Sequence, residues 1–80
     1  MEYKDLFNEP KNEINAIADA LNKAIKACEE MDIGDFANED AEIECAATIL
    51  GNTKKAQKLV EKLDRKLLAV SAKLNNKLLV

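Results

Sequence analysis

A stretch of 28 residues without glycine or proline, residues 53–80, constrains the fold more than any other part of the chain. Within it, apolar residues recur at alternating spacings of four and three. That spacing is typical of one helix face close to a heptad seam. The residues of this face are Ala56, Val60, Leu63, Leu67, Val70 and Leu74. The stretch therefore predicts a long helix, against which the rest of the chain must pack.

The first half of the chain predicts another helix over residues 9–32. Pro10 lies just inside its start, where the missing N–H of proline is tolerated. Gly34 follows its end and can adopt the left-handed conformation that terminates helices. The predicted core-facing residues are Ile14, Ile17, Leu21, Ala24, Cys28 and Met31, widened by Ala18 and Ile25.

Residues 39–50 predict a short helix with Asn38 as its N-cap. Gly51 and Asn52 then predict a break, because Gly followed by Asn and Thr is typical of one helix ending and another beginning. The alternative is a single helix over residues 39–80, which tolerates Gly51 at a cost of roughly 1 kcal/mol relative to Ala.

The sequence thus predicts an all-α fold in a single domain, residues 1–80. We expect a small antiparallel three-helix unit of residues 9–32, 39–50 and 53–79, with residues 1–8 as an N-terminal arm.

A second apolar stripe on the last helix predicts self-association. A helix that is apolar on more than one side needs more than one neighbour. A 12-residue helix also cannot cover two partners of twice its length. We therefore expect a homo-oligomer, a dimeric helical bundle, formed through Leu68, Ala72 and Leu79.

The composition argues against an enzyme. Histidine is absent, and the two cysteines lack the CxxC spacing of metal and redox sites. An EF-hand loop read from Asp32 has Gly34 and Phe36 where it needs oxygen ligands. Nucleophile, base and cofactor motifs are all missing, so we expect no catalytic residues, no metal and no cofactor.

Charge is distributed unevenly along the chain. Residues 1–50 carry a net charge of −9 and residues 51–80 a net charge of +6. The acidic part suggests a non-enzymatic protein-binding module, a small inhibitor or adaptor that covers a basic surface on another protein, such as a nucleic-acid-binding one. Tyr3 and Phe7 would add aromatic anchors. The candidate acidic residues are Asp32, Asp35, Glu39, Asp40 and Glu42; a merely solvated acidic corner is the alternative.

A basic ridge on the last helix suggests a second function, association with nucleic acid. Lys54, Lys58, Lys62 and Arg65 follow one another at helical spacing and could track phosphates. The helix has no aromatic residue to stack on bases, so a solvated ridge or one paired with the acidic helices competes with this interpretation. The third candidate function is a structural module that binds only other copies of itself.

The chain shows no sign of a membrane segment. It has no basic N-terminal region followed by an apolar run, and nothing near the ~20 apolar residues of a membrane-spanning helix. We expect a cytoplasmic protein without a membrane partner. Cys28 and Cys45 should lie at similar heights of an antiparallel hairpin, as small apolar residues.

Overall fold

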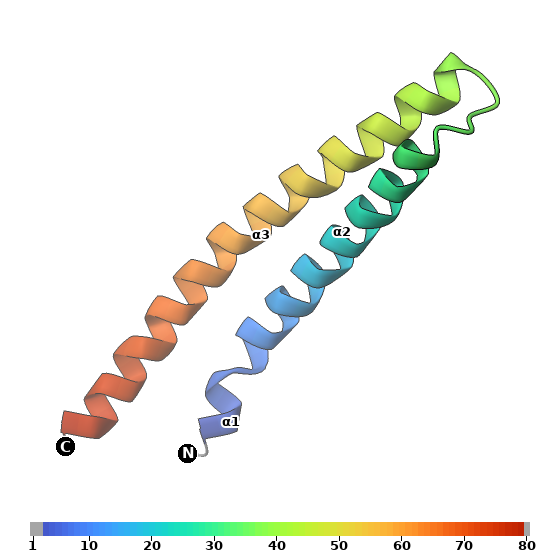
Figure 1. The fold of residues 1–80 in the computed structure, drawn as a ribbon. Helices are drawn as coiled ribbons and strands as arrows, with labels where there is room; N and C mark the ends of the chain where they lie inside the picture. The colour runs from blue at the N-terminus through green and yellow to red at the C-terminus, as the bar shows by residue number, and fades with distance from the viewer. Residues whose placement is uncertain (1–2, 80) are drawn as a thin grey trace.

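The chain folds into a helical hairpin. The computed structural model describes the backbone of residues 3–79 and the side chains of residues 3–76. Its helices are α1 (Tyr3–Leu6), α2 (Asn8–Ile33) and α3 (Glu39–Leu79), and the described residues contain no strand. Figure 1 shows α2 and α3 side by side and antiparallel, with both chain ends at the same end of the rod. The molecule measures 63 × 17 × 14 Å. The all-α prediction is confirmed.

The predicted break at Gly51 and Asn52 is wrong. Residues 39–50 and 53–79 belong to one helix of 41 residues, α3. Gly51 keeps a right-handed backbone, since Gly34 is the one described glycine with a positive φ. The three-helix unit is therefore a two-helix hairpin with a single short turn of helix, α1, before it (Figure 1).

The polar residues around Gly51 explain why the helix continues. Thr48 Oγ1 donates to the Glu44 carbonyl at 2.9 Å, and Asn52 Nδ2 donates to the Thr48 carbonyl at 2.8 Å. Side chains that are typical of caps thus bond back to the preceding turn instead. The roughly 1 kcal/mol cost of a helical glycine is small beside the packing of so long a helix against α2.

The turn between the helices follows the predicted caps. Gly34 adopts φ 69° and its N–H donates to the Glu30 carbonyl at 3.0 Å, closing the C-terminus of α2. Asn38 Oδ1 accepts a 2.9 Å hydrogen bond from the Ala41 N–H, which caps the first turn of α3. Phe36 lies half-buried between them. These caps fix where each helix stops and starts.

The buried face of α2 differs from the predicted one. Its fully buried residues are Pro10, Ala20, Ala24 and Ala27, together with Leu6 of α1. Of the residues expected in the core, Ala24 is buried and Ile17 and Met31 are half-buried. The others are exposed: Ile14, Ala18, Leu21, Ile25 and Cys28. Two stripes with the same alternating spacing lie side by side on α2, one of small and one of large residues. Periodicity alone could not decide which of them meets α3.

Small side chains let the two helices approach closely. The thiol of Cys45 on α3 donates to the backbone carbonyl of Ala27 on α2, with a sulfur–oxygen distance of 3.1 Å. A side chain as short as cysteine can reach the neighbouring backbone only where the helices nearly touch. The seam predicted on α3 is confirmed except at one position: Val60 is exposed and Leu59 beside it is half-buried. The other predicted seam residues are buried or half-buried, namely Ala56, Leu63, Leu67, Val70 and Leu74.

Candidate interaction surfaces

The turn end of the hairpin is acidic. Residues 29–44 hold eight carboxylates and no lysine or arginine. All eight are exposed, including the five that the sequence suggested: Asp32, Asp35, Glu39, Asp40 and Glu42. The caps at Gly34 and Asn38 fold this segment back on itself, so the end of α2 and the start of α3 share the charge. We refer to residues 29–44 as the acidic end.

Two isoleucines stand exposed within the acidic end. Ile33 is 75% exposed and Ile43 is 58% exposed. Neither isoleucine is among the binding residues that the sequence suggested. Ile33 occupies the last position of α2, next to the capping Gly34, and Ile43 lies outside the α2–α3 seam. In the sequence, the signal for exposed apolar residues here was their position between carboxylates. Neither isoleucine is needed to continue the buried seam.

The two aromatic candidates in the N-terminal arm, Tyr3 and Phe7, lie far from the acidic end. Tyr3, in α1, and Phe7, directly after it, are exposed. Figure 1 shows α1 at the open end of the hairpin, the end opposite the α2–α3 turn. The acidic end lies at the other end of a molecule 63 Å long. The two groups of candidate partner-binding residues therefore form separate surfaces. Leu6 between them is buried, which holds α1 against the hairpin.

The basic ridge of α3 is accessible. Its four residues Lys54, Lys58, Lys62 and Arg65 are exposed, and none forms an ion pair with another described residue. A neighbouring cation behaves differently. Lys66 turns toward α2, where its Nζ lies 2.7 Å from Glu13 Oε1.

The Glu13–Lys66 pair is set partly inside the hairpin. The Glu13 side chain is only 15% exposed. Its hydrogen bond to Lys66 holds the pKa of the Glu13 carboxyl below its usual value, and the same bond raises the pKa of the Lys66 ammonium. The pair fills a position of the α2 seam where every neighbouring seam residue is apolar or small. It acts as a structural crosslink, not as a site with a raised-pKa acid.

The two cysteines occupy the same level of the hairpin but different environments. Cys45 contacts Ala27, the residue next to Cys28. Cys45 is buried, and burial raises the pKa of its thiol. Cys28 is exposed, and the two are not joined by a disulfide. This arrangement agrees with the expected similar heights.

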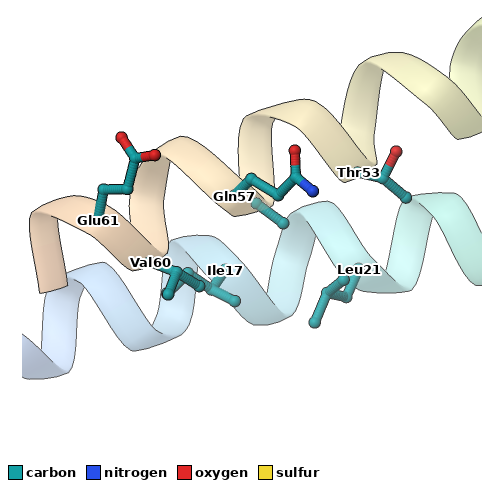
Figure 2. Close-up of a pocket in the computed structure, with 7 residues that line it drawn as sticks. Ile17, Leu21, Thr53, Gln57, Val60 and Glu61 are labelled. Atoms are coloured by element: carbon teal, nitrogen blue, oxygen red, sulfur yellow. The ribbon is translucent and has the colours of Figure 1, made fainter. Parts of the chain in front are cut away.

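A shallow groove of about 650 Å³ runs between the helices near the middle of the rod. Figure 2 shows Ile17 and Leu21 of α2 and Val60 of α3 along it, with Thr53, Gln57 and Glu61 on the α3 side. Ile14 and Ile25 lie seven residues before and four residues after Leu21, so they extend the same face of α2. We call Ile14, Ile17, Leu21, Ile25 and Val60 the groove face.

The stripe predicted for self-association lies outside the groove face. Leu68 is 70% exposed, and Ala72 is exposed one turn further along α3. The side chain of Leu79 lies outside the described part of the chain. Leu68 and Ala72 are thus accessible, on the part of α3 that points away from the seam with α2.

Within the described residues, no group of three or more acidic or cysteine side chains is placed to bind a metal ion. In the same part of the chain, no helix has both the length and the apolar character needed to cross a lipid bilayer. Comparison of the chain with family models, curated protein sequences and solved structures gave no match.

Proposed function

We propose that this hairpin is a non-enzymatic protein-binding module, a small stoichiometric inhibitor or adaptor that acts through its acidic end. The partner is another protein with a basic surface, such as one that binds nucleic acid. The observation that carries the proposal is the concentration of eight exposed carboxylates around two exposed isoleucines at one end of a narrow rod.

The chemistry of the acidic end suits this role. Carboxylates raise the association rate with a basic surface by electrostatic steering. Affinity then depends on apolar groups that become buried on contact. Ile33 and Ile43 supply such groups within the same end, whereas Tyr3 and Phe7 would be used only by a partner that reaches the open end of the rod.

Assembly into a dimeric bundle and a cytoplasmic location belong to the same proposal. A hairpin of only two long helices leaves half of the described large aliphatic residues of α2 and α3 exposed, four on each helix, which supports a second copy as an additional neighbour. Burial of Cys45 as a small apolar residue fits a reducing compartment, where thiols stay unpaired.

The test removes charge from the acidic end. The protein is immobilised, proteins it retains are identified, and the affinity of the purified partner is measured for wild type and for the variant D35N/E39Q/D40N. We expect the variant to bind about tenfold or more weakly, and the wild-type affinity to fall as salt rises from about 50 to 300 mM.

The matched control removes the same three charges elsewhere. The variant D5N/D19N/D64N changes three exposed carboxylates outside the acidic end and should bind within about twofold of wild type. Circular dichroism verifies that both variants keep their helix content. Equal loss in both variants, or an affinity untouched by D35N/E39Q/D40N, contradicts the proposal.

Association with nucleic acid is the second candidate function. It is supported by the exposure of Lys54, Lys58, Lys62 and Arg65 along one uninterrupted helix. Fluorescence anisotropy with a random duplex and a single strand at low salt tests it. Binding that weakens steeply with salt and is lost in K58Q/K62Q supports this function. Salt of about 50 mM permits contacts with phosphates, so the absence of binding at that concentration rules this function out.

A further inference from the structure

The hairpin exposes more surface than a chain of its mass normally does. Its accessible surface is 6229 Å². An average folded monomer of 8.9 kDa exposes about 4,800 Å². The difference of about 1,400 Å² exceeds the roughly 800 Å² that each partner contributes to a stable interface of standard size. The excess accessible surface is therefore large enough for one extensive interface.

The groove face is the apolar surface that best fits such a contact. Its residues Ile14, Leu21, Ile25 and Val60 are 51%, 42%, 55% and 42% exposed. Leu21 of α2 and Val60 of α3 line the groove (Figure 2). Ile14 and Ile25 continue the Leu21 face of α2 at helical spacing. One broad side of a rod of 63 × 17 Å offers about 1,000 Å², enough for a standard interface.

The hairpin geometry explains why these large residues stay outside. The α2–α3 contact uses the alanine stripe Ala20, Ala24 and Ala27, which brings the helices close but buries little apolar area per residue. The stripe of large residues beside it is then available. A second hairpin laid on this face would complete a four-helix arrangement in which each α2 buries both of its stripes.

We propose that the groove face binds the groove face of a second copy of this chain, and that the two hairpins run antiparallel. This deepens, and rests on, the dimeric bundle of the proposed function. The contact is isologous, with a two-fold axis near Leu21 and Val60, at the middle of the rod.

Charge selects the antiparallel orientation. A parallel pair would place two acidic ends side by side, sixteen carboxylates over residues 29–44 of both copies, with no basic residue among them. Like charges brought together at an interface are costly. An antiparallel pair instead sets each acidic end beside the open half of its partner. That half, residues 1–20 and 57–80, holds eight of the chain's twelve lysines and arginines and seven carboxylates, a net charge of +1 against −4 for residues 21–56.

The first experiment measures solution mass by sedimentation equilibrium from about 5 to 500 μM. Wild type is expected to have twice the 8.9 kDa chain mass. L21K should raise the dimer dissociation constant about a hundredfold or more, because two-fold symmetry places the substitution on both sides of the contact. L68K is the matched control and should change that constant less than about threefold. Lysine and leucine have similar helix propensities, so neither variant should unfold the hairpin.

The second experiment measures orientation. A spin label is attached at A37C in a C28S background; Ala37 is exposed in the turn and Cys45 is buried. Antiparallel hairpins 63 Å long should separate the two labels by on the order of 50 Å, and parallel ones by less than about 25 Å. A short distance overturns the antiparallel arrangement.

The outcomes separate this inference from the proposed function. If L68K dissociates the dimer and L21K does not, the groove face is wrong while dimeric assembly stands. If wild type stays monomeric at the highest concentration, both the assembly and the groove contact fail, whereas binding through the acidic end is tested independently by D35N/E39Q/D40N. If circular dichroism shows that L21K is unfolded, I25K takes its place with the same expected loss.

Discussion

Lys66 of α3 donates a 2.7 Å hydrogen bond to Glu13 of α2, a residue 53 positions earlier in the chain. The contact joins the two helices toward the open end of the hairpin, while the Cys45–Ala27 hydrogen bond joins them near the turn. Between these two points the buried and half-buried side chains are small or branched and apolar, except Asn52 and Thr53, whose hydrogen bonds stay within α3. The two polar contacts therefore specify the register in which α2 and α3 lie against each other.

The Glu13–Lys66 pair should give stability a defined pH dependence. The folded pKa of Glu13 lies below its usual value of 4.5, so the unfolded chain binds more protons in that range and stability falls as pH decreases through it. E13Q should be less stable than wild type near neutral pH, because Lys66 then lacks its charged partner, and the difference should shrink as pH falls below 4.5 through the lowered pKa of Glu13.

Urea unfolding from about pH 3 to 8 measures this effect. The matched control is D19N, since Asp19 and Lys23 form a largely exposed pair at 3.3 Å on the surface of α2. A pair of that kind contributes little. A gap between E13Q and wild type that stays constant with pH contradicts the assignment. At alkaline pH the pair should hold until pH exceeds the usual Lys value of 10.5, since the folded pKa of Lys66 is raised.

Gly51→Ala should stabilise the protein by about 1 kcal/mol, because alanine is the better helix former. A Cβ at this position meets nothing within 4 Å. Thermal and urea unfolding measure the change. A loss of stability would show that Gly51 ends a helix, as the sequence had predicted.

Gly34→Ala should change stability in the opposite direction to Gly51→Ala. Gly34 has φ 69°, a conformation that costs a residue with a Cβ about 1 kcal/mol or more. We expect a stability loss of this size in the same unfolding experiments. Because Gly34 has a positive φ and Gly51 lies inside a right-handed helix, equal effects at both positions would contradict the structure.

Ala24→Leu should destabilise the hairpin by about 1–3 kcal/mol, because it forces the closely packed helices apart. Ala24 is buried, whereas Ala18, on the same helix, is exposed. Ala18→Leu is therefore the control and should change the free energy of unfolding by less than about 0.5 kcal/mol. If Ala24→Leu is neutral, the alanine stripe does not face α3.

The two cysteines should react at very different rates with iodoacetamide. Burial raises the pKa of Cys45 and so lowers the fraction present as the reactive thiolate at a given pH. Cys28 is exposed and should react about tenfold faster or more near pH 8. Mass spectrometry of timed samples distinguishes the two thiols. Denaturation in urea should make the rates nearly equal, and equal rates in the folded protein would contradict the burial of Cys45.

The helices and their caps at the turn were predictable because the signals are local. Gly34 and Asn38 act on the backbone within one turn of their own positions. The continuity of α3 at Gly51 was not predictable, because Asn is favoured at a helix N-cap, yet here the Asn52 side chain donates to the Thr48 carbonyl within the helix. A continuous helix and a helix broken at Gly51 differ by only about 1 kcal/mol in helix propensity. Tertiary packing therefore decides between them.

The choice of buried stripe was also beyond the sequence. Ala20 and Leu21 belong to stripes of the same spacing, and hydrophobicity favours the one with larger residues. The structure buries the alanines because a two-helix contact gains from close approach. For the candidate site, the carboxylates followed from composition. The exposure of Ile33 and Ile43 depends on where the seam runs, and that was unknown.

The hairpin topology makes each contact along α2 and α3 progressively less local. The Ala27–Cys45 contact closes a loop of 18 residues and the Glu13–Lys66 contact one of 53. Closing the longer loop directly from the unfolded chain costs about 1 kcal/mol more in chain entropy. The folding route with the smallest loss of chain entropy therefore begins at the turn, and the pairing of α2 with α3 then extends toward the termini. The open end, with its ion pair, is the last part to form and the first to fray, so protection of backbone amides from hydrogen exchange should decline from the acidic turn toward both chain ends.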